Sequence, residues 1–171
     1  MRIGIIGGGA SGLLAGIFAK DASNEVIILE RNKECGKKIL ATGNGRCNYW
    51  NDDQDLVHYQ SNSFNLIGKL IDKNVDDMVL SFFNRLGIIP KIKSGYYYPY
   101  SNQAITIKNS LIEEAKRKNV EIRNEFLVTD VEHINNKFIV YGLNEKIIVD
   151  KLVIATGSYA APKTGSDGMG Y

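Results

Sequence analysis

Three glycines near the N-terminus have the spacing of a phosphate-binding turn. The sequence reads Gly7-x-Gly9-x-x-Gly12, with Ala10 and Ser11 between the second and third glycines. In such a pattern the first glycine permits a tight turn, the second lets the backbone approach a pyrophosphate, and the third lets a helix pack closely on a strand. The N–H groups at the start of that helix attract phosphate oxygens. We therefore expect these five residues to bind the phosphates of a dinucleotide.

An acidic residue stands where such a site needs one. Glu30 closes the second apolar run, 18 residues after Gly12, and a carboxylate there accepts hydrogen bonds from ribose hydroxyls. Its negative charge disfavours the 2′-phosphate of NADP, although an arginine beside such an acid, here Arg31, accepts that phosphate in some proteins. The loop alone leaves both NAD and FAD open. A tight strand–helix turn without any ligand is the alternative interpretation.

The elements that position these groups are expected around them. Residues 2–6 and 26–29 are short apolar runs, and residues 11–20 are rich in Leu, Ala, Ile and Phe. This order predicts a strand, a helix and a strand in a right-handed parallel βαβ unit. Residues 94–101 are rich in tyrosine and contain a turn-like Pro99. Their tyrosines are expected to cover a sheet, and stacking on a ring is the alternative. Further elements are expected downstream: helices over residues 76–86 and 105–118, and strands over residues 120–123 and 152–155.

A three-part β segment favours FAD over NAD. Residues 126–133, 137–142 and 145–149 are predicted to be strands joined by Asn-rich turns. An NAD-binding half continues with strands and helices at short intervals, whereas here a polar excursion over residues 32–62 follows Glu30. This layout resembles the FAD domains of the glutathione-reductase-like superfamily, in which the β-meander lies over the nucleotide. The resemblance implies an α/β, Rossmann-like FAD-binding domain of glutathione-reductase type, a parallel sheet with a three-stranded β-meander, and FAD contacts from Val128, Ala155, Thr156 and Gly157.

The excursion carries a second group of residues that suit a cofactor. Residues 36–48 read GKKILATGNGRCN, in which the glycines allow close backbone approach and the asparagine amides donate and accept hydrogen bonds. Arg46 supplies a fixed guanidinium for phosphate or for the electron-rich edge of a reduced flavin. A solvated basic loop with turn glycines is the alternative. The residues expected at the cofactor are Lys37, Lys38, Thr42, Gly43, Asn44, Gly45, Arg46, Cys47 and Asn48.

Three stretches together resemble one bacterial family. They are residues 36–48, SGYYYPYSNQA at 94–104 and LVIATGSYAAPKTGSDGMGY at 152–171, and they are similar to the BaiN-like (YhiN-like) NAD(P)/FAD-dependent oxidoreductases. The resemblance covers the chain in order. It implies a flavin-dependent oxidoreductase that uses NAD(P)H, a small organic substrate, or both. Two residues depart from the family pattern: Ser158 stands where a second glycine is usual, and Met169 where a small or acidic residue is usual.

The resemblance also implies a longer protein. Such proteins carry an inserted substrate-side domain and a C-terminal segment that completes the flavin pocket. Residues 1–171 are therefore expected to be an N-terminal FAD-binding fragment that binds FAD weakly or not at all and self-associates through an exposed apolar strip. No catalytic residue is assigned, because the residues that face the substrate would lie largely beyond this stretch.

Charge and cysteine content weigh against several other classes. The chain has 21 Lys and Arg, 19 Asp and Glu and a net charge of +2, with no basic stripe that would indicate a nucleic acid partner. An FAD protein serving tRNA modification stays open as an alternative, as does a fragment without retained FAD or activity. Cys35 and Cys47 are too few for a secreted disulfide framework and lack CxxC spacing, so we expect free thiols, no metal site and a cytoplasmic protein. No apolar stretch is long enough to span a membrane.

Overall fold

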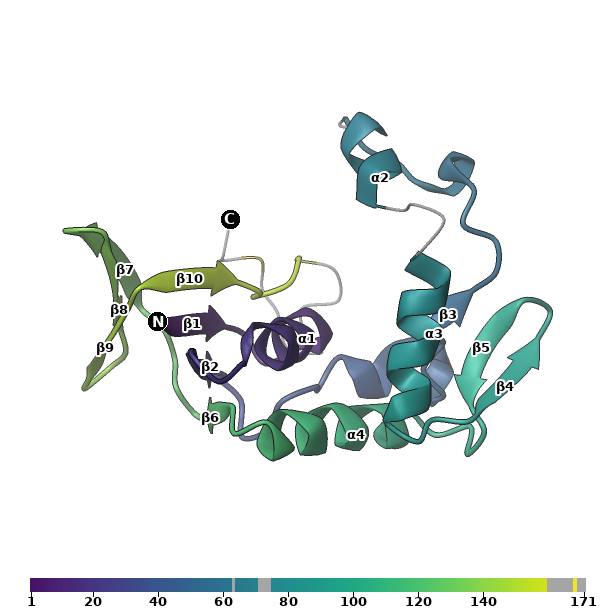
Figure 1. Ribbon diagram of the computed structural model, residues 1–171, viewed down its shortest axis with the longest axis horizontal. Coiled ribbons are helices and arrows are strands. Elements are labelled where there is room, and N and C mark those ends of the chain that lie inside the picture. The colour runs from purple at the N-terminus through teal and green to yellow at the C-terminus, as the bar shows by residue number, and fades with distance from the viewer. Residues whose placement is uncertain (63, 71–74, 160–167, 169–171) are drawn as a thin grey trace.

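Four parallel strands form the central sheet of the computed structural model, which describes residues 1–62, 64–70, 75–159 and 168. Every neighbouring pair in the sheet is parallel. All four carboxyl ends therefore lie at one edge, the edge to which the arrows of β1 and β10 point in Figure 1. The strands, in spatial order, are β10 (Lys151–Ile154), β1 (Arg2–Ile6), β2 (Glu25–Leu29) and β6 (Glu121–Arg123).

The inner strands are apolar on both faces because both faces are covered. Ile5 and Ile28 belong to one hydrophobic cluster, whereas Ile27 and Leu29 belong to a second cluster. Parallel strands buried on both sides show such continuous apolar runs rather than alternation. The edge strand β10 differs, since Ile154 is 51% exposed. The sequence predicts that an exposed apolar strip mediates self-association, and this association stays a prediction.

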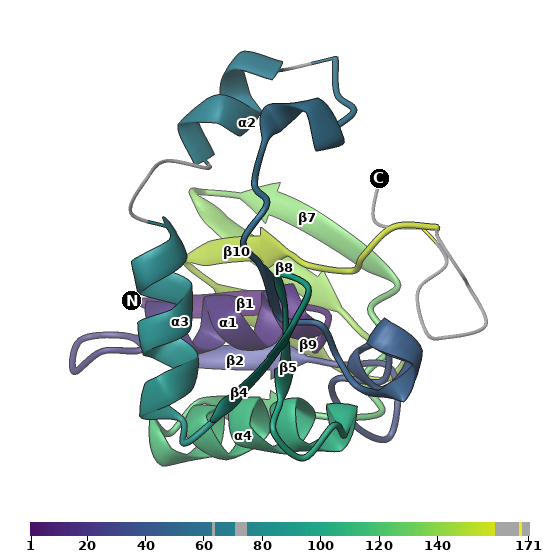
Figure 2. The same ribbon diagram turned by 90° about the vertical axis from the view of Figure 1, so that its right-hand side faces the viewer.

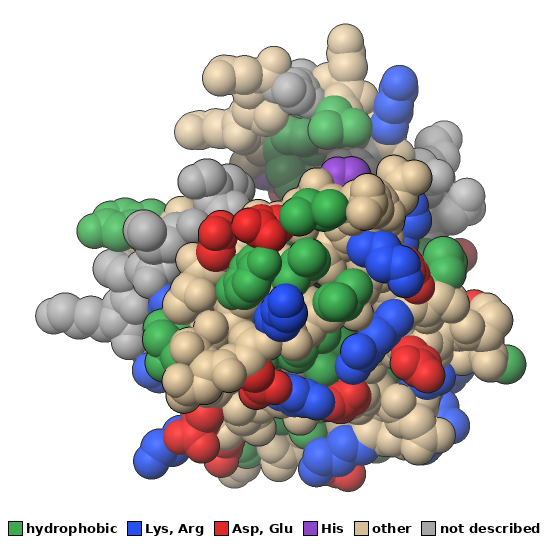
Figure 3. All heavy atoms as spheres, turned by 90° about the vertical axis from the view of Figure 1, so that its left-hand side faces the viewer, with side chains coloured by type: hydrophobic (Ala, Val, Ile, Leu, Met, Phe, Trp, Pro, Cys, Tyr) green, Lys and Arg blue, Asp and Glu red, His purple; other side chains and the backbone are tan. Residues whose placement is uncertain are grey.

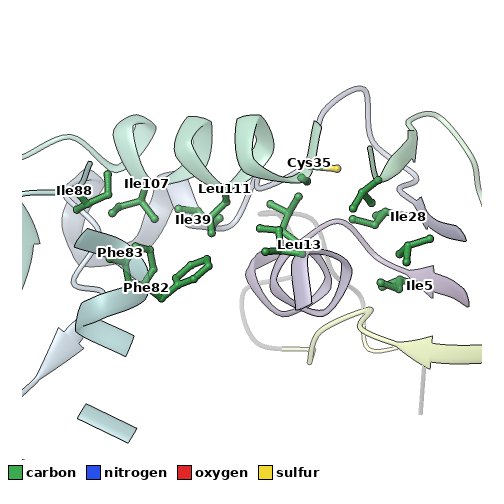
Figure 4. Packing of buried hydrophobic residues seen from close by; sticks show 14 of the residues in the cluster. Ile5, Leu13, Ile28, Cys35, Ile39, Phe82, Phe83, Ile88, Ile107 and Leu111 are labelled. Carbon is green, nitrogen blue, oxygen red and sulfur yellow. The ribbon is translucent and has the colours of Figure 1, made fainter. Parts of the chain in front are cut away.

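Two helices cover the first face of the sheet. They are α1 (Ala10–Ala19) and α4 (Ala104–Arg117). Helix α1 approaches β2 closely because Gly16 has no side chain: a Cβ there would lie 2.9 Å from Ile28 Cδ1. Figure 4 shows Leu13 of α1 beside Ile28 and Ile5, with Leu111 of α4 in the same core. Helix α3 (Val75–Arg85) completes this core through two phenylalanines, Phe82 and Phe83.

An antiparallel meander covers the second face. Its strands are β7 (Asp130–Ile134), β8 (Lys137–Tyr141) and β9 (Lys146–Val149), paired in that order. Val140 and Val149 are almost fully buried and pack with Leu29 and Phe126. The three-stranded meander predicted from the sequence is therefore confirmed. Figure 3 views the molecule from the meander side and shows hydrophobic side chains interspersed with charged ones on its outer face.

The excursion after β2 and the tyrosine-rich stretch together build a small second sheet, visible edge-on in Figure 2. Its strands, in spatial order, are β3 (Trp50–Asn51), β5 (Tyr96–Pro99) and β4 (Pro90–Lys93), and both pairings are antiparallel. Pro99 ends β5 and pairs with Pro90, which begins β4, and its carbonyl accepts from the Asn102 N–H at 2.8 Å, so the turn expected at Pro99 begins there. Proline is tolerated at strand ends, where a ladder N–H is not needed. The other elements of this region are η1 (Ile39–Gly45), η2 (Leu56–His58) and α2 (Phe64–Leu70).

The other predicted helices and strands lie within a few residues of their expected bounds. The predicted α/β fold with a parallel sheet is therefore confirmed. In the part of the chain that the structure describes, no helix has the length and apolar character needed to cross a bilayer.

Candidate dinucleotide-binding site

Three predicted segments lie side by side at the carboxyl edge of the sheet. Gly7 follows β1 and its N–H donates to the Leu29 carbonyl at 2.8 Å, next to Glu30. The Ala155 N–H, which follows β10, donates to the Ile6 carbonyl at 2.8 Å. Ligands of open parallel α/β sheets bind at this edge. The glycine turn, the acid and the Ala-Thr-Gly segment thus meet where a nucleotide is expected.

The three motif glycines differ in what a side chain at each position would meet. Gly7 has a φ of +103°, and an added Cβ would lie 2.5 Å from the Ala155 carbonyl oxygen. A Cβ on Gly12 would lie 1.8 Å from the Gly7 carbonyl oxygen. At Gly9, by contrast, an added Cβ meets nothing within 4 Å in the part of the chain that the structure describes. The turn and the helix packing therefore require Gly7 and Gly12, whereas Gly9 faces open space.

That open space fits a phosphate group. Gly9 is the N-cap of α1 and has no side chain to cap the helix, so the first N–H groups of the helix, from Ala10 and Ser11 onward, have no partner within it. Free N–H groups and the positive end of the helix dipole together attract phosphate. The structure therefore gives Gly9 the geometry that the sequence pattern predicts.

Gly8 is a tightly constrained position that the motif did not single out. Its N–H donates to Glu30 Oε2 at 2.7 Å, and its carbonyl accepts from the Gly36 N–H at 2.8 Å. A Cβ at Gly8 would lie 2.3 Å from Cys35 Sγ. The peptide groups on both sides of Gly8 are fixed, and no larger residue fits. The unbroken Gly7-Gly8-Gly9 run was the available signal.

Glu30 is a buried carboxylate, 7% exposed, that orients the turn. Besides the Gly8 N–H, it accepts hydrogen bonds at Oε1 from the backbone N–H and the Nδ2 of Asn32, at 2.8 Å and 2.5 Å. Each carboxylate oxygen has two lone pairs, so Oε2 retains a lone pair for a ligand hydroxyl. The ribose contact stays a prediction. The neighbouring Arg31 is exposed.

A lysine joins the excursion to the segment after β10. Lys38 Nζ donates to the Ser158 carbonyl at 3.3 Å. Ser158 departs from the family pattern, but a carbonyl makes this contact and any residue supplies one. Lys37 is exposed, and Gly157 has a φ of +78° beside Thr156. The second departure, Met169, lies outside the described residues.

The loop over residues 42–48 has an unusual backbone. Positive φ angles occur at Gly43 (54°), Asn44 (55°), Gly45 (81°) and Cys47 (59°). Non-glycine residues in this region cost on the order of 1 kcal/mol or more each, so the surroundings must hold them. The Cys47 N–H donates to the Thr42 carbonyl at 3.0 Å and closes the loop. Such strain is typical of functional sites.

Two side chains of this loop suit a polar ring system. Arg46 Nε donates to the Gly43 carbonyl at 3.1 Å, and its guanidinium lies 5.0 Å from the centre of the Tyr98 ring. This contact brings β5 against the loop. Asn48 Oδ1 is buried without a hydrogen-bond partner among the described residues. An unsatisfied buried acceptor costs free energy, and a donor on a bound group would satisfy it.

The predicted residues thus fall into separate places. The glycine turn, Glu30, Lys38 and Ala155 lie together. The 42–48 loop instead packs against Tyr98, and its Cys47 is buried in the core beneath it. The Val128 side chain packs, partly buried, against the core under the meander. Whether all of these touch one cofactor stays a prediction.

Both cysteines are buried free thiols, as expected. Burial and the nearby Glu30 carboxylate raise the pKa of Cys35 to about 12, with partial opposition from the Lys108 ammonium. Burial also raises the pKa of Cys47. The nucleophilic thiolate is therefore absent near neutral pH. Within residues 1–62, 64–70, 75–159 and 168, no group of three or more His, Cys, Asp and Glu could hold a metal ion.

Comparisons with known proteins show the family to which the chain belongs. Residues 1–171 match the family described as HI0933-like protein Rossmann domain. The chain is 38% identical to a 3-dehydro-bile acid delta(4,6)-reductase of Clostridium scindens, over 99% of this chain and 42% of that protein. It is 28% identical to a ribosomal RNA dihydrouridine synthase of Escherichia coli, over 98% of this chain and 42% of that protein. The chain therefore spans less than half the length of these curated relatives.

Solved structures share the fold at low sequence identity. A 3-ketosteroid-delta4-(5alpha)-dehydrogenase from Rhodococcus jostii RHA1 superposes with a TM-score of 0.59 at 16% identity, over 92% of this chain and 46% of that one. Thermovibrio ammonificans THI4 gives a TM-score of 0.58 at 16% identity, over 91% of this chain and 57% of that one. The match over residues 1–171 confirms the family that the sequence resembled. The chain belongs to the HI0933-like Rossmann domain family, and its cofactor is FAD.

Proposed function

We propose that this chain is the FAD-binding part of an oxidoreductase that reduces a carbon–carbon double bond. The observation that carries the proposal is the bond change shared by its relatives. One relative is named as a delta(4,6)-reductase of a bile acid and another as a dihydrouridine synthase. Their substrates differ completely, yet a reduced steroid alkene and dihydrouridine both arise when two hydrogens add across a double bond. FAD supplies the hydride transfer that such a reduction needs.

The turn after β1 is proposed to hold the pyrophosphate of FAD. The N–H groups that follow Gly9 lie at the start of α1, and a Cβ added to this glycine would meet no atom of the described residues within 4 Å. Glu30 is proposed to accept the ribose hydroxyls while it holds the Gly8 N–H. Lys37 and Lys38 would add positive charge, and residues 155–157 and Val128 would border the nucleotide.

The 42–48 loop is proposed to contact the flavin ring. Its guanidinium, fixed between the Gly43 carbonyl and the Tyr98 ring, can stabilise negative charge on an adjacent group. The buried Asn48 Oδ1 would accept a hydrogen bond from a ring N–H. Both residues bind and orient. No proton donor for the substrate is assigned among the described residues.

The electron donor and the substrate are parts of the same proposal. NAD(P)H is the proposed donor and a small organic alkene the proposed substrate. RNA is the second candidate, because two relatives are ribosomal RNA dihydrouridine synthases. The two buried free thiols suit a reducing cytoplasm as the setting.

The test uses the complete protein, purified under anaerobic conditions. We expect bound flavin in the visible spectrum, bleaching of that flavin by NADH or NADPH, and reoxidation by one of two acceptors. The acceptors are a conjugated keto-steroid and a uridine-containing RNA, and mass spectrometry would show the gain of two hydrogens on one of them. Flavin that neither acceptor reoxidises would contradict double-bond reduction but leave FAD binding intact.

A further inference from the structure

The described residues include two buried charged side chains, and both lie close to Cys35. They are Glu30, 7% exposed at the end of β2, and Lys108, 6% exposed in α4. A buried ammonium costs free energy unless it is paired, and an apolar side chain of similar length fills the same space without that cost. Glu30 already has a structural and a proposed ligand role. The charge of Lys108 needs an explanation of its own.

Lys108 holds a short turn at both ends. Its Nζ lies 2.5 Å from Glu34 Oε2, and this ion pair keeps the pKa of the Glu34 carboxyl below its ordinary range. The stem of the lysine lies against Gly36, where an added Cβ would come within 2.9 Å of Lys108 Cγ. Gly36 has a φ of +76°, which a residue with a side chain rarely adopts. The lysine therefore fixes the 34–36 turn by charge and by shape.

Residues 34–36 are hydrogen-bonded to the phosphate-binding turn at residues 7–12. The Gly36 N–H donates to the Gly8 carbonyl at 2.8 Å. On its other side, the Gly8 N–H donates to Glu30 Oε2 at 2.7 Å. One buried charge thus acts on each side of Gly8, directly through Glu30 and indirectly through Lys108. The next residue, Gly9, is the one that faces open space.

Cys35 shows how closely these groups approach one another. It is 2% exposed, and its Sγ occupies the position that a side chain on Gly8 would need. Glu30 raises the pKa of this thiol and Lys108 lowers it, so both charges act at one point. Figure 4 shows Cys35 beside the end of α4, between Leu111 and Ile28.

We propose that Lys108 is a positioning residue for FAD: through Glu34 and Gly36 it fixes the Gly8 peptide, so that the turn presents its N–H groups to the pyrophosphate before the cofactor arrives. The inference rests on the proposed binding of FAD at the glycine turn. Binding to a preformed turn avoids the cost of ordering it, which is why the role should appear in affinity as well as in backbone dynamics.

The test compares Lys108→Met, Lys108→Arg and Glu34→Gln in the complete protein. We expect Lys108→Met to raise the Kd for FAD by about tenfold, measured by titration of apoprotein with FAD. Amide hydrogen exchange at Gly36 and Gly8, whose N–H groups are hydrogen-bonded in this turn, should accelerate in the FAD-free form of the same variant. Lys108→Arg keeps a cation and should restore most of the affinity, and Glu34→Gln should show a smaller loss because a neutral amide still accepts from the lysine.

The matched control is Ile107→Val, one residue earlier in α4. Ile107 is 2% exposed in the core, so this variant loses a methyl group and thermal stability without touching the 34–36 turn. Its FAD affinity should not change. Equal losses of affinity in Lys108→Met and Ile107→Val would reduce Lys108 to a general stability role and overturn the inference, as would unchanged affinity in Lys108→Met. A Gly9→Val variant that still binds FAD would instead overturn the site itself, and the positioning role with it.

Discussion

Two glycine-containing loops differ in how their conformation is held. The turn at residues 7–12 is held by its own glycines and by neighbouring strands, since a Cβ at Gly12 would lie 1.8 Å from the Gly7 carbonyl oxygen. The loop at residues 42–48 includes non-glycine residues with positive φ, and Arg46 stacks on Tyr98 from a different sheet. The glycine spacing of the first loop reflects a local contact, that of Gly12 with Gly7, although distant residues such as Ala155 also border this turn. The second loop has no such spacing, and its contact with Tyr98 spans more than fifty residues of sequence.

This difference explains what each loop reveals in sequence. A turn whose glycines are fixed by an adjacent strand and helix keeps a recognisable spacing, because any change produces a steric collision. A loop held by distant contacts has no such spacing rule. Its function is visible only through resemblance to relatives or through the folded structure. Substitutions in the first loop should therefore cause large losses of FAD affinity or stability, whereas substitutions in the second loop should cause smaller ones.

The largest effect is expected at Gly9. Gly9→Val places a side chain in the space proposed for the pyrophosphate and should weaken FAD binding by roughly a hundredfold or more. The fold should be kept, because an added Cβ meets no atom of the described residues within 4 Å. Flavin content and circular dichroism would measure both. Gly12→Ala is the matched contrast: its collision with Gly7 should lower the free energy of unfolding by about 1–3 kcal/mol. Equal flavin content in Gly9→Val and wild type would refute the assignment of this turn.

Glu30→Ala should rank second. Two hydrogen bonds to a charged acceptor contribute about 2–4 kcal/mol, so FAD should bind roughly thirtyfold more weakly. Because Glu30 also holds the Gly8 N–H, loss of the turn and loss of the ribose contact must be separated. The ratio of Kd values for ADP and 2′-deoxy-ADP does this, since only the ribose contact distinguishes the two ligands. A ratio near one in the wild-type protein would place the ribose elsewhere.

The buried thiol of Cys35 should make the free energy of unfolding depend on pH. Cys35 lies behind the first turn with a pKa raised from 9.0 to about 12. The unfolded chain ionises this thiol above its ordinary pKa while the folded chain does not, so stability is complete below about pH 9 and falls as the pH rises. The free energy of unfolding should decrease by about 1.4 kcal/mol per pH unit more in wild type than in Cys35→Ala. Urea unfolding at several alkaline pH values measures the difference, and parallel curves would mean that the thiol ionises normally.

The smallest effect is expected at Arg46. Its stacking on Tyr98 is worth about 0.5–1 kcal/mol at an exposed site, so Arg46→Ala should weaken FAD by about two- to fivefold. The visible spectrum of bound flavin should also shift if the guanidinium lies beside the ring. Arg46→Lys keeps the charge but not the planar fork and should fall between the two. A loss as large as that of Gly9→Val would show that the second loop is as critical as the first.

Sequence alone predicted the sheet, the meander and the glycine turn because each depends on local periodicity or spacing. It did not predict the small second sheet, because β3 has only two residues and pairs with a strand far along the chain. The role of Gly8 was missed since its constraint comes from Cys35 and Gly36, which fold back onto it. Lys108 was invisible for the same reason: in sequence it is one charged residue within an amphipathic helix.

The position of β1 has a consequence for how the chain folds during synthesis. β1 lies between β2 and β10, and the Arg2 N–H donates to Asp150 Oδ2 across a separation of 148 residues. A ribosome adds about 5–20 residues per second, so the edge of β1 that pairs with β10 stays unpaired for roughly ten seconds until β10 has been synthesised. Contacts of such long range slow folding and leave an unpaired strand edge in the meantime. Expression at low temperature or with chaperones should therefore raise the soluble yield more than any change at the cofactor site.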